Sequence, residues 1–440
     1  MRLINVRTFE FHDFLDPKAC AYAIVSHRWT DEEVTYIEFP QSASRNRTGF
    51  GWTKIKHACK IAIDHKLEWV WMDTCCIDKT SSAELTEAIN SMFHWYKMAK
   101  VCFVFLSDVH RLEQNHDVET KASTFRARKR EVGLYEDNFK KSDWFSRGWT
   151  LQELLAPREV LFYNRDFNCI GSRAELSALV AAATGIQRLY VEQPLSSDVL
   201  QDLSIAERMR WASTRETTKE EDMAYCLLGI FDVNMPLLYG EGKKAFTRLQ
   251  LELVKKSDDE SIFAWDPYGS LNPSDGLLAS TPAAFRSNGM MHDPMLFHYP
   301  HSMTNKGLQM TLDIPEEWTG LPKPLQRSER SNSGLSFDDR RYQKEHTTQF
   351  MLPLNCTTYT SNAKGQSEAH AVAIRFQATV LKANIAILGY REGRLELIPG
   401  SSADDWLPKS SEHGASTSAI VIGKARKTRP WTVYFPQKGL

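Results

Sequence analysis

The stretch Ala21-Tyr22-Ala23-Ile24-Val25, followed directly by Ser26-His27-Arg28-Trp29, decides the fold of this chain. Five apolar residues in a row, without alternation, predict a strand buried on both faces, which is typical of a parallel sheet covered by helices. The polar cluster then lies at the carboxyl end of that strand. In open α/β sheets ligands bind at such ends, in the crevice beside the strand where the strand order reverses. We therefore expect a site at residues 26–29.

Further apolar runs repeat this pattern as far as residue 165. The predicted strands are 69–72, 100–106 and 160–163, and the helices between them are 52–66 and 82–96. The first helix should place its apolar residues on one face, namely Trp52, Ile55, Cys59, Ala62 and Ile63. Ser81 or Ser82 can cap the second, with Glu84 placed for a capping box. The alternation predicts a doubly wound parallel α/β sheet with helices on both faces and right-handed crossovers.

The sequence pattern changes twice in the rest of the chain, first to helical and then to β-rich. Residues 166–260 have a helical period and should form an extension packed on the sheet domain, with helices at 175–184, 205–213, 219–228 and 246–256. Its polar and aromatic residues should form an ion-pair network against that domain: Arg208, Trp211, Arg215, Glu221, Asp222 and Tyr225. Residues 261–440 indicate a β-rich module with strands at 349–354, 372–380, 385–388 and 431–435. The polar stretches 322–343 and 401–418 should be mobile.

Composition restricts the class of protein. At 440 residues, with 42% hydrophobic and 25% charged residues, the chain should form two or three soluble domains. A formal net charge of -1 argues against nucleic-acid binding through bulk electrostatics. The basic run Arg126–Arg130 is read as a solvated loop rather than a localisation signal. No apolar run is long enough to span a membrane, and residues 1–16 are too charged for a signal peptide.

Eight cysteines are scattered along the chain and none forms a CxxC pair. Several lie in predicted apolar elements, which favours reduced, buried thiols over disulfides or a metal site. We therefore expect a cytoplasmic protein without a bound metal. The usual dinucleotide, nucleoside-triphosphate and zinc-protease motifs are also absent from the sequence.

Polar residues should converge where the parallel strands end. The candidates are Ser26, His27 and Arg28 after the first strand, Asp73 and Cys75 after the second, Ser107 and Asp108 after the third, and Glu153 before the fourth. Each also has a structural interpretation. Asp73 could bond backbone amides or cap a turn, and Cys75 could be a nucleophile with His27 as its base or, as we favour, a buried thiol. Arg28 needs an anionic partner, from a ligand or from the protein. Trp29, Trp144 and Trp149 offer flat surfaces for stacking, or pack in the core.

Four segments in order resemble the fungal heterokaryon-incompatibility (HET) domain. They are residues 22–29 (YAIVSHRW), 71–79 (WMDTCCIDK), 82–92 (SAELTEAINSM) and 147–153 (RGWTLQE). The segment from Trp211 to Gly242 resembles the sequence that commonly follows this domain. The family is associated with non-self recognition and programmed cell death when unlike hyphae fuse. It is also considered a distant relative of TIR domains, several of which cleave NAD at the nicotinamide–ribose bond.

The resemblance implies a flavodoxin/TIR-like fold and a function for the candidate residues. Glu153 lies where NAD-cleaving TIR domains keep their catalytic glutamate. The substrate-binding residues would be Ser26, His27, Arg28, Trp29, Asp73 and Trp149, although Ser26-His27-Arg28 differs from the TIR first loop. NAD would be the substrate, with no further cofactor, and self-association or a protein trigger would supply the partners.

Two other interpretations stay open. Many TIR-like domains are adaptors, so the chain could be a non-catalytic death-fold module that acts by self-association and partner binding. A weaker alternative is a thiol hydrolase that uses Cys75.

Overall fold

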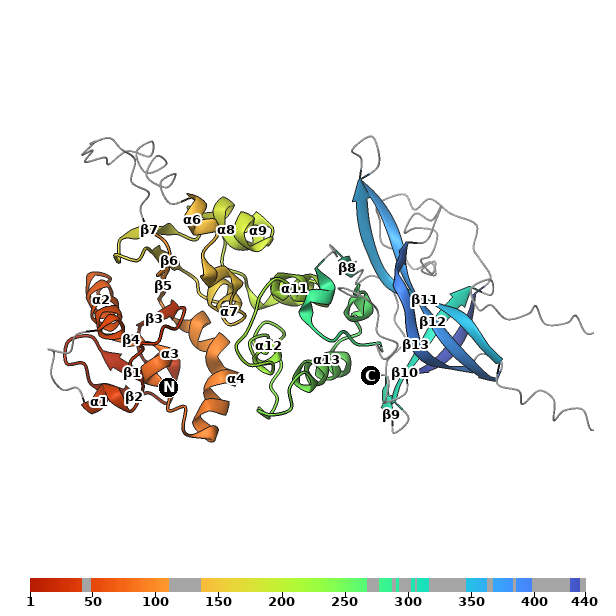
Figure 1. Ribbon diagram of the computed structural model, residues 1–440, viewed down its shortest axis with the longest axis horizontal. Coiled ribbons are helices and arrows are strands. Elements are labelled where there is room, and N and C mark those ends of the chain that lie inside the picture. The colour runs from red at the N-terminus through yellow and green to blue at the C-terminus, as the bar shows by residue number, and fades with distance from the viewer. Residues whose placement is uncertain are drawn as a thin grey trace, which may run out of the picture. The chain divides into compact units, whose positions relative to one another are not determined.

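The computed structural model describes most of the N-terminal part of the chain and the strands of its C-terminal part (Figure 1). The described residues are 1–41, 49–110, 136–266, 277–286, 290–292, 302–304, 307–315, 346–361, 367–382, 385–397 and 428–435. Arg126–Arg130 and the stretches 322–343 and 401–418 lie outside them. The chain divides into two compact units, one of Met1–Asp202 with Thr214–Ala245 and the other of Leu203–Ser213 with Phe246–Leu440.

The first unit is built on a seven-stranded sheet of order β2-β1-β4-β3-β5-β6-β7. Its strands are β1 Arg2–Asn5, β2 Phe11–Asp13, β3 Tyr22–His27, β4 Trp69–Trp71, β5 Val101–Phe105, β6 Val160–Tyr163 and β7 Cys169–Ser172. β3 pairs in parallel with both β4 and β5, and β6 pairs in parallel with β5. The predicted α/β fold is thus confirmed, with the 22–27 strand fully buried in the sheet interior.

The sheet is mixed rather than wholly parallel. β1 pairs antiparallel with β2 and β4, and β7 pairs antiparallel with β6. These strands are three or four residues long and partly exposed, so they lack the continuous apolar run that identifies a buried strand. The four predicted strands are parallel, as expected. β1, β2 and β7 were not predicted for that reason, and they make the complete sheet mixed.

Helices cover both faces of the sheet, with α2 on one side and α4 and α7 on the other (Figure 1). The helices of this unit are α1 Glu38–Gln41, α2 Phe50–Asp64, α3 Asp73–Cys76, α4 Ser82–Met98, α6 Glu136–Lys140, α7 Thr150–Leu155, α8 Ser177–Thr184, α9 Arg188–Glu192, α10 Ser197–Asp202 and α12 Asp222–Tyr225, with 3-10 turns η1 Pro17–Ala19 and η2 Asp143–Ser146. Ser81 caps α4 by accepting a hydrogen bond from Glu84 N–H. The Glu84 carboxylate accepts from Asp78 N–H and Arg2 instead of completing a capping box.

Two predicted helices differ from the structure. The apolar face of α2 includes buried Ile55, Cys59 and Ala62, but Ile63 is 36% exposed, so its position is on the margin of that face. The helix expected over 219–228 is reduced to the single turn of α12. Glu221 and Asp222 accept hydrogen bonds from neutral donors, the backbone N–H groups of Gly240 and Gly242 and the side chains of Trp149 and Tyr239. Those contacts replace the expected ion pairs of these two carboxylates.

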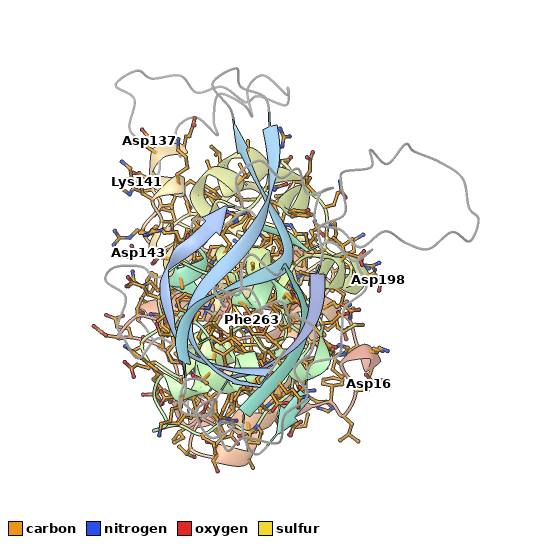
Figure 2. All side chains as sticks on the ribbon, turned by 90° about the vertical axis from the view of Figure 1, so that its right-hand side faces the viewer. Asp16, Asp137, Lys141, Asp143, Asp198 and Phe263 are labelled. Atoms are coloured by element: carbon orange, nitrogen blue, oxygen red, sulfur yellow. The ribbon has the colours of Figure 1, made fainter. Side chains whose placement is uncertain are left out.

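The second unit contains α11 Ile205–Ala212, most of α13 Lys244–Lys256, the turns η3 Glu260–Phe263 and η4 Pro282–Phe285, and a second seven-stranded sheet of order β8-β11-β12-β13-β14-β10-β9. Its strands are β8 Met290–His292, β9 Ser302–Thr304, β10 Gly307–Pro315, β11 His346–Ser361, β12 Ser367–Lys382, β13 Ile385–Leu397 and β14 Thr428–Phe435. The long strands curve strongly (Figure 2). Every strand pair is antiparallel except β13 with β14. The predicted β-rich character is confirmed, and β11, β12 and β13 extend well beyond the predicted runs.

The structure describes the side chains of seven cysteines, and no disulfide joins any two of them. Five of them are buried: Cys59, Cys75, Cys76, Cys102 and Cys226. Among the described residues, no helix is both long enough and apolar enough to cross a membrane.

Candidate functional site

Glu153 lies on α7, a six-residue helix in which every residue is buried. The start of this helix is fixed by Thr150, whose hydroxyl contacts the carbonyl oxygens of Trp144 and Arg147. The buried Arg215 guanidinium donates to the same Arg147 carbonyl and to Thr150 Oγ1, both at 2.9 Å. The helix that carries Glu153 is therefore held rigidly against the preceding turn.

The Glu153 carboxyl group points at the end of β3. Ser26 Oγ donates a short hydrogen bond to Glu153 Oε2, and Trp144 Nε1 donates to Ser26 Oγ at 2.8 Å. Tyr96, on α4, hydrogen-bonds to the Val25 carbonyl at 3.0 Å and also contacts Glu153. The structure thus brings together Ser26 and Glu153, which are 127 residues apart.

Burial controls the charge of this carboxyl group. Glu153 is only 8% exposed. Desolvation raises its pKa to about 8, and the nearby Asp73 adds to this, while Ser26, Tyr96 and Arg215 act in the opposite direction. Burial thus favours the neutral, protonated form of Glu153 over the carboxylate. A positive charge placed beside it would favour the carboxylate.

This perturbation predicts a pH-dependent difference between the wild type and Glu153→Gln. The pKa is higher in the folded state than the ordinary value of 4.5. The folded protein therefore binds the proton more tightly, and this contribution to stability is lost as pH rises from about 4.5 to 8. Glutamine stays neutral throughout. The free energy of unfolding of the wild type should fall relative to the variant by roughly 3 to 5 kcal/mol between these pH values.

Urea unfolding of both proteins at pH 5, 6, 7 and 8 measures this difference. Because both proteins share every other titrating group, taking the difference removes their contributions. Parallel stability curves would mean that Glu153 is already ionised in the folded protein at pH 5.

His27 belongs to a second buried cluster, at the other side of the same strand end. Glu33 Oε1 lies 2.5 Å from Lys54 Nζ, and Glu33 Oε2 lies 3.4 Å from His27 Nε2. Burial alone would raise the pKa of Glu33, but His27 and Lys54 hold it well below its usual range. Among the described residues, His27 Nδ1 has no hydrogen-bond partner although it is buried.

Arg28 and Trp29 point outward from β3. Arg28 forms an exposed ion pair with Asp143, so the protein itself provides its anionic partner. The Trp29 indole is half exposed, donates to Asp73 Oδ2 at 2.8 Å, and has Lys79 Nζ 3.5 Å from its centroid. Asp73 thus contacts the first loop through the Trp29 side chain, whereas the structural interpretation had been a bond to backbone amides or a cap on a turn.

Trp149 lies in a different contact set from Ser26. Its indole N–H donates to Asp222 Oδ2 at 3.2 Å, and Tyr239 donates to the other oxygen of the same carboxylate. The preceding Gly148 packs tightly, because a Cβ there would lie 2.6 Å from Thr217 Cγ2. The Arg147-Gly148-Trp149 motif therefore docks the segment that follows the domain.

Cys75 is the buried thiol that the sequence favoured. It is fully buried on α3, and burial raises its pKa well above the ordinary value. A thiol that resists ionisation is a poor nucleophile, so the geometry gives no support to a thiol hydrolase.

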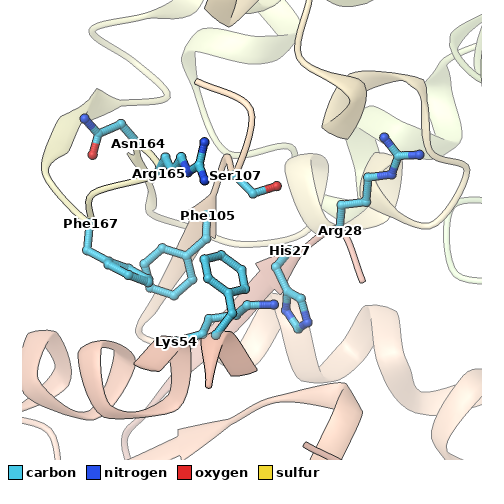
Figure 3. A pocket seen from close by; sticks show the side chains of 9 residues that line it. His27, Arg28, Lys54, Phe105, Ser107, Asn164, Arg165 and Phe167 are labelled. Carbon is cyan, nitrogen blue, oxygen red and sulfur yellow. The ribbon is translucent and has the colours of Figure 1, made fainter. Parts of the chain in front are cut away.

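Two hollows open at the carboxyl ends of β3 and β5. The first hollow is shallow and open to solvent, with only about 10 Å³ accessible to the centre of a water-sized sphere, and is lined by His27, Arg28, Phe50, Lys54, Phe105, Ser107, Asn164, Arg165 and Phe167 (Figure 3). The second is larger, with about 90 Å³ accessible in the same sense, and is lined by Arg28, Phe105, Leu106, Ser107, Asp108, Asp143 and Trp144. They share Arg28, Phe105 and Ser107. Asp108 is held in place by hydrogen bonds from Ser142 Oγ and Asp143 N–H.

Several residues of this site were not identified as site residues from the sequence. They are Glu33, Lys54, Tyr96, Asp143 and Arg165. Tyr96 is the last residue of the predicted helix 82–96, and Lys54 lies one position from buried Ile55 on α2. The one available signal was the sheet topology, since Arg165 lies two residues after the end of strand 160–163. No cluster of three or more possible metal ligands occurs among the residues that the structure describes.

Comparison with known proteins agrees with the sequence motifs. The family described as "Heterokaryon incompatibility protein (HET)" matches residues 22–153, from the first residue of β3 to Glu153. Vegetative incompatibility protein HET-E-1 of Podospora anserina is 41% identical over 249 residues. That match covers 56% of this chain and 17% of the Podospora protein. No solved structure matches the chain. Residues 22–153 of the chain therefore match the heterokaryon-incompatibility (HET) domain that the sequence motifs indicated.

Proposed function

We propose that this chain acts in fungal non-self recognition and that its HET domain does so by hydrolysing NAD at the nicotinamide–ribose bond. The matching HET family and the Podospora vegetative incompatibility protein support the first part. The observation that supports NAD hydrolysis is the Glu153 carboxyl group, which is buried and hydrogen-bonded to Ser26 at the end of β3.

The strand order also supports a nucleotide site. The parallel strands run β4-β3-β5-β6, which is the order 2-1-3-4 along the chain. Flavodoxin-like sheets have this order, and they bind their ligand at the switch point between the first and third strands. β3 and β5 are those strands here, and both hollows open at their carboxyl ends.

The reaction needs little from the protein. The C1′–N bond breaks with its electron pair going to the nicotinamide nitrogen, which leaves neutral nicotinamide and an oxocarbenium-like ribose. Water adds to C1′ and releases a proton, so NAD and water give nicotinamide, ADP-ribose and a proton. The leaving group is already cationic, so no general acid is needed, in contrast to glycoside hydrolysis. A single carboxylate facing the positive ribose stabilises the transition state electrostatically.

Release of nicotinamide tests this function directly. Purified full-length protein mixed with NAD should produce nicotinamide and ADP-ribose in equal amounts, as separated by liquid chromatography. The assay should be repeated over a hundredfold range of protein concentration, because self-association would raise the activity per molecule. Absence of nicotinamide at every concentration would reject hydrolysis and favour the non-catalytic module that acts by self-association.

A further inference from the structure

The two hollows differ in the charged side chains that line them. The first is lined by His27, Arg28, Lys54 and Arg165. Glu33, which is not among its lining residues, lies against Lys54 and His27 and balances part of this positive charge. The second contains the carboxylates of Asp108 and Asp143. Arg28 lies in both and pairs with Asp143. A groove with a basic half and an acidic half favours a ligand that carries both charges along its length.

The basic half has features of a built site. Lys54 and the His27 side chain are almost fully buried, and His27 Nδ1 has no hydrogen-bond partner among the described residues. An unsatisfied buried polar atom of this kind is costly unless a ligand uses it. In Figure 3 the Arg165 guanidinium lies beside Ser107, whereas that of Arg28 points away from the other labelled side chains.

The wall opposite His27 is held in a strained conformation. Phe167 has a φ of 60°, which is rare for a bulky residue. Asn164 Oδ1 fixes this turn by accepting hydrogen bonds from Asp166 and Asn168 N–H. The Phe167 ring stacks on His57 with centroids 4.0 Å apart. Such strain persists where the surrounding structure imposes it, often at ligand sites.

We propose that the two hollows form one dinucleotide groove, in which the basic hollow binds the pyrophosphate and the acidic hollow receives the cationic nicotinamide ring. This inference rests on the proposed function and fixes the direction in which the substrate lies. The ring end is then beside Trp144, which hydrogen-bonds through Ser26 to Glu153. The Arg28–Asp143 ion pair lies where the basic and acidic hollows meet. Asp143 competes with the pyrophosphate for Arg28, and Arg28 competes with the cationic ring for Asp143.

Binding of inorganic pyrophosphate, measured by calorimetry, tests the basic half without any reaction. Arg165→Glu should weaken it at least about tenfold, because a charge-assisted contact is replaced by repulsion. Arg158→Glu is the matched control, since Arg158 is exposed and precedes β6 whereas Arg165 follows it. Asp143→Asn removes the partner of Arg28, which can then bind pyrophosphate. The affinity for pyrophosphate should rise only about two- to fivefold, because the exposed ion pair that is lost is weak.

The acidic half is tested with NAD and NADH, whose rings differ in charge. In the Glu153→Gln background, which leaves both hollows intact, NAD should bind more tightly than NADH. Asp143→Asn should reduce this preference while it strengthens pyrophosphate binding. Equal effects of Arg165→Glu and Arg158→Glu, or an unchanged NAD preference, would overturn the proposed groove. Pyrophosphate binding with the expected pattern but no nicotinamide release would instead reject only the hydrolysis.

Discussion

Glu153→Gln should fold normally and lose at least ~100-fold in the rate of nicotinamide release, because one well-placed electrostatic group contributes about that much. The substitution is nearly isosteric. The glutamine oxygen can still accept the hydrogen bond from Ser26, and the neutral amide suits the buried position, which disfavours a charged carboxylate. What the variant lacks is the capacity to become an anion when positive charge develops on the ribose.

The pH profile separates this role from a structural one. Because burial raises the pKa of Glu153 to about 8, kcat/KM of the wild type should rise with pH through that region. Bound NAD brings a cationic ring near the carboxyl group, which lowers the pKa. The rise with pH should therefore occur at lower pH in the profile of kcat than in that of kcat/KM. Any residual activity of the variant should lack this rise.

Ser26→Ala provides the second comparison. It removes the hydroxyl that joins Glu153 to Trp144 but leaves the carboxyl group in place. A positioning role for Ser26 predicts a smaller loss than that of Glu153→Gln and a shifted rise with pH. Full nicotinamide release by folded Glu153→Gln would reject Glu153 as the catalytic group.

The sequence predicted the sheet where burial is uniform and failed where it is not. The run from Tyr22 to Val25 is apolar at every position because both faces are covered, and this alone identified β3. β1 and β7 are short strands at or near the sheet edges, and their mixed residues carry no such signal. Their positions follow from pairing with distant strands, which no local pattern records.

The site was predictable to the extent that topology determined it. Ser26 and Glu153 meet because β3 and α7 are both placed by the parallel sheet, and that convergence was expected. Trp149 was expected at the same place, but its indole reaches Asp222 instead. Trp149 lies at the start of a short helix, where the spacing of residues in the sequence does not determine the direction of the side chain. The partners of His27 and Arg28 depended on loop geometry that the sequence does not specify.

Ile24→Asp should abolish stable folding or lower the free energy of unfolding by several kcal/mol, because an unpaired buried charge is that costly. Ile24 is 0% exposed and lies between Trp71 of β4 and Cys102 of β5 in the sheet register. No described strand neighbour offers it a counter-charge at that position.

Ile63→Asp makes the same chemical change at a residue that is 36% exposed on α2. It should cost less than about 1 kcal/mol, as surface substitutions usually do. Thermal and urea unfolding of both variants measure the contrast. Equal stability of the two would mean that β3 is not the interior strand around which the sheet and its site are built.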